Sequence, residues 1–204
     1  MITQKDIDKS MSFEQFYQLT EDLVKNEGTT GSDKSSAMVN YTKLNFSRMK
    51  RILKTTPISD EVLNTVECLS DKLTWVVLVE SWCGDAAQNL PVFAKIAEAN
   101  PNINLRILLR DDNLDVMNQY LTNGGMSIPK LIALDENLNE LGTWGPRPKF
   151  LQDWMYENKA NPKMEMSELK EKFQIWYTKD KGQTLQKEMV SLMRAWENKE
   201  CFSI

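Results

Sequence analysis

Residues 73–86 read Leu73-Thr74-Trp75-Val76-Val77-Leu78-Val79-Glu80-Ser81-Trp82-Cys83-Gly84-Asp85-Ala86, and this stretch decides the fold. Its first seven residues form a nearly continuous apolar run with β-branched side chains, which is typical of a strand covered on both faces. Residues 83–100 then have the apolar spacing of a helix, with Pro91 expected to kink it. The stretch therefore predicts a strand that delivers Cys83 to the first turn of a helix.

A thiol at that position is expected to be a nucleophile. Unpaired backbone N–H groups and the positive end of the helix dipole favour the thiolate of Cys83 over the thiol. Asp85 opposes this effect with a negative charge nearby, and Trp82 is expected to shield one side of the sulfur. A cysteine that merely ends the strand is the alternative.

The pattern on either side of this stretch predicts an α/β fold. Apolar residues at helical spacing come first, and the later elements alternate between strands and helices. The closing pair of strands implies an antiparallel edge beside a right-handed parallel crossover. The predicted elements are helices over 12–24, 40–54 and 59–69, strands over 103–109, 130–135 and 141–144, and a short helix over 112–121 that Asp112 and Asp115 cap.

Composition excludes several classes of function. The chain has 204 residues, a formal net charge of −4 and no histidine, so Ser-His-Asp and Cys-His catalysis and His-ligated metal sites are excluded. The three cysteines, at 68, 83 and 201, are too far apart in sequence to favour a zinc site. Neither a metal nor a cofactor is expected.

Charge and hydropathy also restrict the partners and the location. An acidic chain is a poor partner for nucleic acid, because phosphate binding needs a concentrated positive field. No apolar stretch has the length of a membrane span, and residues 1–6 lack the apolar core of a signal peptide. These features predict a cytoplasmic protein that binds neither membranes nor nucleic acid.

A cluster of basic residues and one separate arginine each allow two interpretations. The helix over 40–54 bunches its cations, which are expected to form a solvated face, with a site for an acidic partner as the alternative. Arg147 lies between two prolines after the last strand and is expected at the surface; binding a carboxylate or phosphate through its planar fork is the alternative. The bunched cations are Lys43, Arg48, Lys50, Arg51 and Lys54.

The chain ends in helical stripes rich in aromatic residues, which include Trp176 and Trp196. We expect these stripes to wrap the core of their own chain. Formation of a homodimer is the alternative, so the sequence leaves open a monomer or a homodimer.

The stretch around Cys83 resembles the active site of the thioredoxin superfamily, whose signature is Trp-Cys-Gly-Pro-Cys after the first central strand. Pro91 matches the proline that bends the active-site helix of those proteins, and Ser127-Ile128-Pro129 resembles their cis-proline loop. The resemblance covers residues 58–160, and the whole chain is similar to bacterial thioredoxin-like proteins with helical extensions and a Trp-Cys-Gly-Asp site. It implies a thioredoxin-like α/β fold, a central mixed sheet with flanking helices, over 58–160, with helical extensions over 1–57 and 161–204.

The resemblance also implies roles for individual residues. Cys83 matches the nucleophile, and the Ile128–Pro129 bond is expected to be cis, with the backbone of Ile128 pairing with an extended substrate. Ala86 replaces the second, resolving cysteine of the family, and Val77 replaces its buried acid. An engineered Ala86 that traps the mixed disulfide is the less favoured explanation. The residues expected to contact substrate are Trp82, Gly84, Asp85, Ile128 and Pro129.

One thiol can begin disulfide exchange but cannot complete it alone. Release of the mixed disulfide would need a small-molecule thiol, a cysteine of a protein substrate, or Cys68 or Cys201 of the chain itself. Release by a small thiol would resemble a monothiol glutaredoxin, and release by a substrate thiol would resemble an isomerase. We therefore expect a monothiol thiol–disulfide oxidoreductase or isomerase-like protein that acts on protein or small-molecule thiols and disulfides, with a non-catalytic peptide-binding module as the alternative.

Overall fold

A four-stranded mixed sheet forms the centre of the molecule in the computed structural model, which describes residues 1–159 and 165–196. The strand order is β2-β1-β3-β4, with β1 and β2 parallel and the pairs β1–β3 and β3–β4 antiparallel. The strands are β1 (Leu73–Val79), β2 (Ile103–Leu109), β3 (Lys130–Leu134) and β4 (Glu140–Trp144). This arrangement is the predicted α/β, thioredoxin-like fold.

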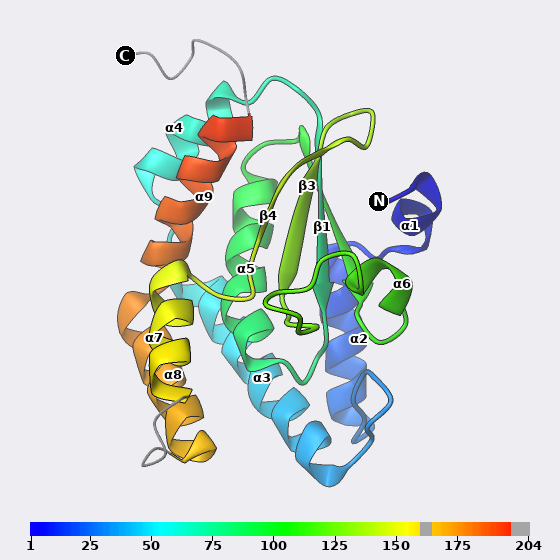
Figure 1. Ribbon diagram of the computed structural model, residues 1–204, viewed down its shortest axis with the longest axis vertical. Helices are drawn as coiled ribbons and strands as arrows, with labels where there is room; N and C mark the ends of the chain where they lie inside the picture. Colours follow the sequence, from blue (N-terminus) through cyan, green and yellow to red (C-terminus); the bar gives the residue numbers. More distant parts are fainter. Residues whose placement is uncertain (160–164, 197–204) are drawn as a thin grey trace.

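Helices cover both faces of this sheet (Figure 1). The helix α5 lies on one face with α4 and α9 beside it, whereas α2 and α6 lie on the other. The helices of the described residues are α1 (Gln4–Lys9), α2 (Phe13–Lys25), α3 (Ser36–Thr55), α4 (Asp60–Cys68), α5 (Gly84–Glu98), α6 (Leu114–Met117), α7 (Lys149–Lys159), α8 (Met166–Asp180) and α9 (Gln183–Trp196).

The local sequence explains where several of these helices begin. The Ser12 side chain accepts a hydrogen bond from the Gln15 amide at the start of α2, and Ser59 accepts from the Val62 amide at the start of α4. The predicted helix over 112–121 is much shorter, because the amides of Gln119 and Tyr120 bond three residues back and end α6. Asn113, rather than either aspartate, is the N-cap residue of α6.

One hydrophobic cluster joins the sheet to both helical extensions. Its buried members include Phe16 and Met49 before the sheet, Trp75 and Val77 within it, and Met189 in α9 after it. The helix α9 packs against α4, α5 and β4, and the ring of its Trp196 meets Trp75 edge to face at 6.1 Å. The C-terminal stripe of α9 therefore packs on the core of its own chain.

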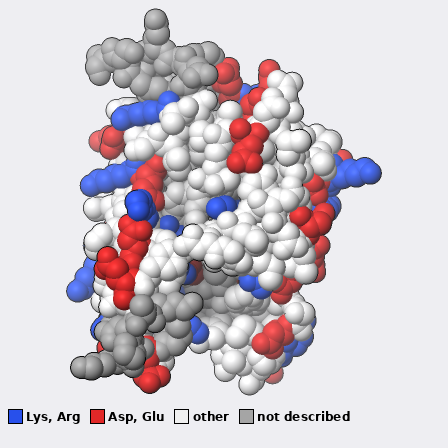
Figure 2. All heavy atoms as spheres, viewed as in Figure 1, with Lys and Arg blue, Asp and Glu red and all other residues white. Residues whose placement is uncertain are grey.

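The pair α7–α8 forms a second, smaller cluster around Leu151, Leu169, Phe173 and Tyr177. In Figure 1 this pair lies to the left of the lower half of α5. On the face shown in Figure 2, Lys and Arg are interspersed with Asp and Glu over the surface. Within the described ranges, none of the helices combines the length and apolar character that a bilayer crossing requires.

Packing of α9 predicts a large effect of truncating Met189, which is fully buried. We expect Met189→Ala to lower the free energy of unfolding by about 2–5 kcal/mol, because it leaves a cavity in the core. The control Lys187→Ala changes an exposed residue of the same helix and should alter it by less than about 0.5 kcal/mol. Urea denaturation measures both; equal effects would show that α9 does not pack on the core.

Candidate functional site

Cys83 lies at the junction that the sequence predicted, between the end of β1 and the start of α5. It is the N-cap residue of α5, and its Sγ accepts a hydrogen bond from the Ala86 amide at 3.4 Å. The thiol itself donates to the Ile128 carbonyl at 3.3 Å. The sulfur is thus held between a helix N-terminus and the loop before β3.

That loop contains a cis bond between Ile128 and Pro129, and a second cis bond joins Gly145 to Pro146 after β4. Gly145 has φ +119°, and a Cβ atom there would lie 2.2 Å from the Pro129 carbonyl oxygen. Only glycine allows the two loops to approach this closely. The contact brings the segment that carries Arg147 toward the thiol.

Arg147 is largely buried and binds a carboxylate, so the expected surface position is wrong. Its Nε donates to Asp85 Oδ2 at 3.1 Å, its Nη2 reaches the same oxygen, and Nη1 donates to Gln152 at 2.9 Å. The side chains of Arg147 and Asp85 are only 13% and 12% exposed. The ion pair with Asp85 offsets the free-energy cost of burying the guanidinium. The anion that Arg147 binds is therefore a residue of its own chain.

Tyr177 of α8 completes this cluster. Its hydroxyl donates to Asp85 Oδ1 at 2.9 Å and accepts from Asn89 Nδ2 at 3.1 Å. The Arg147 guanidinium also lies over the Phe173 ring, 5.2 Å from its centre. We call Asp85, Arg147, Tyr177 and Asn89 the carboxylate clamp; it fixes α8 over the first turn of α5.

A cavity of about 630 Å³ lies beside α8 and has Cys83 in its lining. Trp82, Cys83, Gly84 and Asp85 form one wall, α3 forms a second, and α7 and α8 close the third. The Ile128 carbonyl accepts the hydrogen bond of the thiol, but neither Ile128 nor Pro129 lines this cavity. Of the residues expected to contact substrate, the structure therefore brings Trp82, Gly84 and Asp85 together around a cavity and leaves Ile128 and Pro129 outside its lining.

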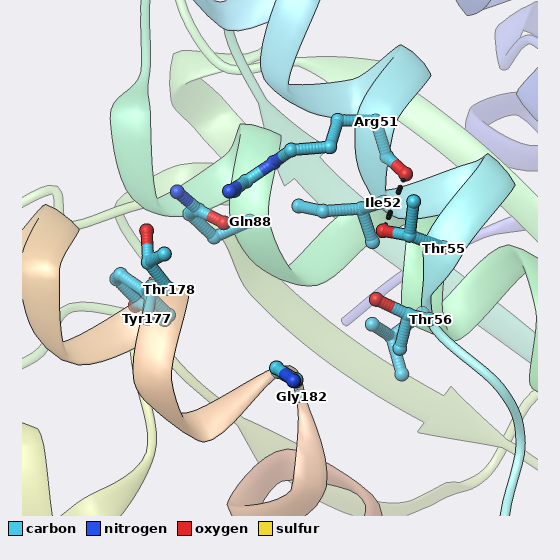
Figure 3. A pocket seen from close by; sticks show the side chains of 10 residues that line it. Arg51, Ile52, Thr55, Thr56, Gln88, Tyr177, Thr178 and Gly182 are labelled. Carbon is cyan, nitrogen blue, oxygen red and sulfur yellow. Dashed lines mark hydrogen bonds between the residues drawn. The ribbon is translucent and has the colours of Figure 1, made fainter.

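A second, smaller cavity of about 220 Å³ lies on the other side of Tyr177. Figure 3 shows Arg51 reaching from α3 toward Gln88, with Tyr177 and Thr178 of α8 facing them. Gln88 donates to Gln174 of α8 at 2.7 Å. This bond further attaches α8 to α5.

Burial keeps the Cys83 thiol protonated. The side chain is 7% exposed, and burial, with the charge of Asp85 as the next cause, raises its pKa to about 12. The amides of Ala86 and Asp85 and the charge of Arg147 act in the opposite direction. The expected favouring of the thiolate is therefore outweighed by the extension that covers the site.

Cys68 is not a neighbour of Cys83. Cys68 ends α4 before the first residue of β1, whereas Cys83 follows its last residue. A seven-residue strand spans about 23 Å, so the two cysteines lie at opposite ends of the sheet. Cys68 is half-buried and disulfide-bonded, and Cys201 lies outside the described residues.

Sequence reasoning missed a buried acid. Val77 is fully buried, as an apolar residue should be, but Glu80 just after β1 is also buried, with 1% exposed. Its Oε1 accepts from the Asp111 amide at 2.9 Å, and burial raises its pKa. The sequence did contain a signal for it, because Glu80 directly follows the apolar run over 73–79. Within the described part of the chain, no group of three Cys, Asp or Glu side chains is arranged to hold a metal ion.

Comparisons with known proteins agree with this fold. A family model described as thioredoxin matches residues 31–170, more than half of the chain. A crystal structure of a protein of unknown function from Pseudomonas aeruginosa is similar over 97% of this chain and 100% of its own, with a TM-score of 0.64 and 17% identity. An HIV epitope scaffold of the 4E10 series has a TM-score of 0.57 and 16% identity, covering 90% of this chain and 98% of its own. None of the curated proteins matches the chain.

The raised pKa of Cys83 predicts the pH dependence of its alkylation by iodoacetamide. Wild type should react slowly at neutral pH and keep accelerating beyond pH 10, since the pKa is about 12. Asp85→Asn removes the second cause of the shift, so its profile should move to lower pH by about one to two units. The control Asp8→Asn changes an exposed residue of α1 and should leave the profile in place.

The same shift has a consequence for stability. The pKa of Cys83 in the folded protein exceeds the value of about 8.5 in an unfolded chain. Its contribution to the free energy of unfolding is therefore complete below about pH 8.5 and is lost as the pH rises toward 12.

The alkylation experiment also has an outcome that would contradict the burial of Cys83. That outcome is a plateau in the alkylation rate near pH 8 to 9, the range of an ordinary thiol.

Proposed function

The chain belongs to the thioredoxin family, and from this premise we propose that it exchanges thiols and disulfides through a single nucleophile, Cys83. The observation that supports the proposal is the placement of that sulfur. It caps the N-terminus of α5 and at the same time lines a cavity of about 630 Å³. That volume is in the range of small-molecule sites, so the proposed substrates are small thiols and disulfides rather than folded proteins.

The proposed reaction has two exchange steps. The Cys83 thiol first loses its proton to water or buffer, and the thiolate attacks one sulfur of a disulfide, RS–SR. The S–S bond breaks, a Cys83–SR mixed disulfide forms, and RS⁻ leaves with the electron pair and takes up a proton. The thiolate of a second small molecule, R′S⁻, then attacks the mixed disulfide, forms RS–SR′ and returns Cys83 as the thiolate.

The residues around Cys83 indicate which thiol would release the mixed disulfide. Ala86, at the position of a resolving cysteine, is 2% exposed and offers only its amide to the sulfur. Cys68 lies at the far end of the sheet. Release by an external small thiol is therefore the proposed route, which resembles the chemistry of a monothiol glutaredoxin.

A non-catalytic binding module is the second candidate, and the protonated thiol favours it. A pKa of about 12 leaves a very small thiolate fraction at neutral pH. The carboxylate clamp also holds α8 closed over the sulfur. In that function the cavity would bind its ligand without covalent chemistry, and Cys83 would serve as an uncharged part of the wall.

Adduct formation with hydroxyethyl disulfide separates the two candidates. Intact mass spectrometry and peptide mapping should find a mixed disulfide on Cys83, formed slowly at neutral pH and about tenfold faster for each unit of pH, because the thiolate is the nucleophile. Added mercaptoethanol should remove the adduct. The matched control Cys83→Ser should carry no adduct at residue 83.

The outcome for the alternative is equally specific. If Cys83 stays unmodified up to about pH 10 while a free-cysteine peptide in the same tube reacts, exchange through Cys83 is disproved. Ligand binding that is unchanged in Cys83→Ser would then establish the binding module.

A further inference from the structure

Arg48 is a cation in the cavity of Cys83 without an anion to bind. It lies on α3 and is half-buried, and its Nη1 donates to Asn45 Oδ1 at 2.8 Å. Among the described residues it forms no ion pair and no other side-chain hydrogen bond. Four of the five guanidinium N–H groups are therefore left for a ligand or water.

Arg48 lies directly beside the first turn of α5. A Cβ atom at Gly84 would lie 3.6 Å from Arg48 Nη1 and 3.3 Å from Gln174 Nε2. The missing side chain at Gly84 thus lets two donors approach the backbone next to Cys83. The helix N-terminus adds its own positive potential at the same place.

The charges that line the cavity leave an excess of positive charge. Arg147 and Asp85 neutralise one another in the carboxylate clamp. Arg48, Lys170 and Glu171 remain on the lining, and the Lys170 ammonium lies over the Tyr41 ring, 5.5 Å from its centre. Two cations therefore face one carboxylate, so an anionic ligand is favoured over a neutral or cationic one.

Burial lowers the pKa of Arg48, and the neighbouring charge of Arg51 acts in the same direction, whereas the charge of Asp85 acts against them. A bound carboxylate would add to the effect of Asp85, because an opposite charge favours the ionised guanidinium.

We propose that the cavity binds a low-molecular-weight thiol or disulfide that carries a carboxylate, with the carboxylate on Arg48 and the sulfur at Cys83. The inference rests on the proposed function for its sulfur chemistry and adds the substrate class. The planar fork of Arg48 can accept a carboxylate through two parallel hydrogen bonds. Apolar side chains of the lining, Met38 and Phe173 among them, would cover the carbon chain between the two ends.

The chain supplies a matched control on the same helix. Arg51 is one turn after Arg48 but lines the smaller cavity, where it reaches toward Gln88 and Thr178 (Figure 3). A substitution of Arg51 removes the same charge and leaves the donors beside Cys83 in place. It therefore separates a carboxylate contact from a general loss of positive charge on α3.

The test measures the rate of adduct formation on Cys83 with dithiodiglycolate and with its uncharged diamide. The leaving thiols of the two disulfides differ in pKa, so each rate is divided by the rate on a free-cysteine peptide under the same conditions. We expect this normalised rate in wild type to be about tenfold higher for the dicarboxylate, the factor of one charge-assisted hydrogen-bond pair. Arg48→Gln should bring the two normalised rates together by slowing the dicarboxylate alone, and Arg51→Gln should keep the difference. Equal normalised rates in wild type would overturn the carboxylate site while leaving exchange through Cys83 intact.

A second measurement does not depend on disulfide exchange. In the Cys83→Ser chain, (methylthio)acetate should perturb the NMR signals of Gly84 and Arg48 more strongly than (methylthio)acetamide, and Arg48→Gln should abolish the difference. Binding without any reaction of the disulfides would disprove the exchange and keep the carboxylate site. No binding together with equal normalised rates would overturn the site, whether or not Arg48→Gln folds.

Discussion

The ion pair between Arg147 and Asp85 is the contact on which the site depends. It joins the loop after β4 to the first turn of α5, and Tyr177 extends it to α8. Burying one of these charges alone would cost several kcal/mol, about 3–5 when a partner is removed. The contact between the loop after β4, the first turn of α5 and α8 is therefore stabilised by these buried charges. The cavity beside α8 lies where the three segments meet.

The same contact changes the chemistry of the thiol. A cysteine at a helix N-terminus is normally a better acid than a free one, and here the amides of α5 do act in that direction. Burial of the sulfur dominates, however, and keeps the thiol protonated. The clamp meanwhile holds α8 beside the first turn of α5, at the edge of the cavity that Cys83 helps to line.

The covering also bears on the kind of substrate. In the uncovered fold the loop before β3 would be free to pair with an extended peptide, but here the Ile128 carbonyl accepts the thiol's own hydrogen bond and lies outside the cavity. The cavity that Cys83 helps to line is bounded by α3 and α8, and the charges of its lining are on balance positive. These two properties are the basis of the proposed small anionic ligand.

The sequence by itself determined the strands, the helix that follows Cys83 and the loop with Pro129, because hydrophobic periodicity and turn residues are local signals. It also located the thiol at the start of that helix and the absence of a second thiol at Ala86. Only the tertiary structure decided that Arg147 is buried on Asp85, that Tyr177 reaches the same carboxylate, and that Arg48 and Cys83 line one cavity. Those contacts join residues about 35 to 92 positions apart in the sequence. A local sequence pattern does not specify which distant charged residues will become neighbours when the chain folds. The pKa of Cys83 depends on its burial and on the charges around it, so the sequence predicted the position of the thiol and the tertiary structure determined its protonation.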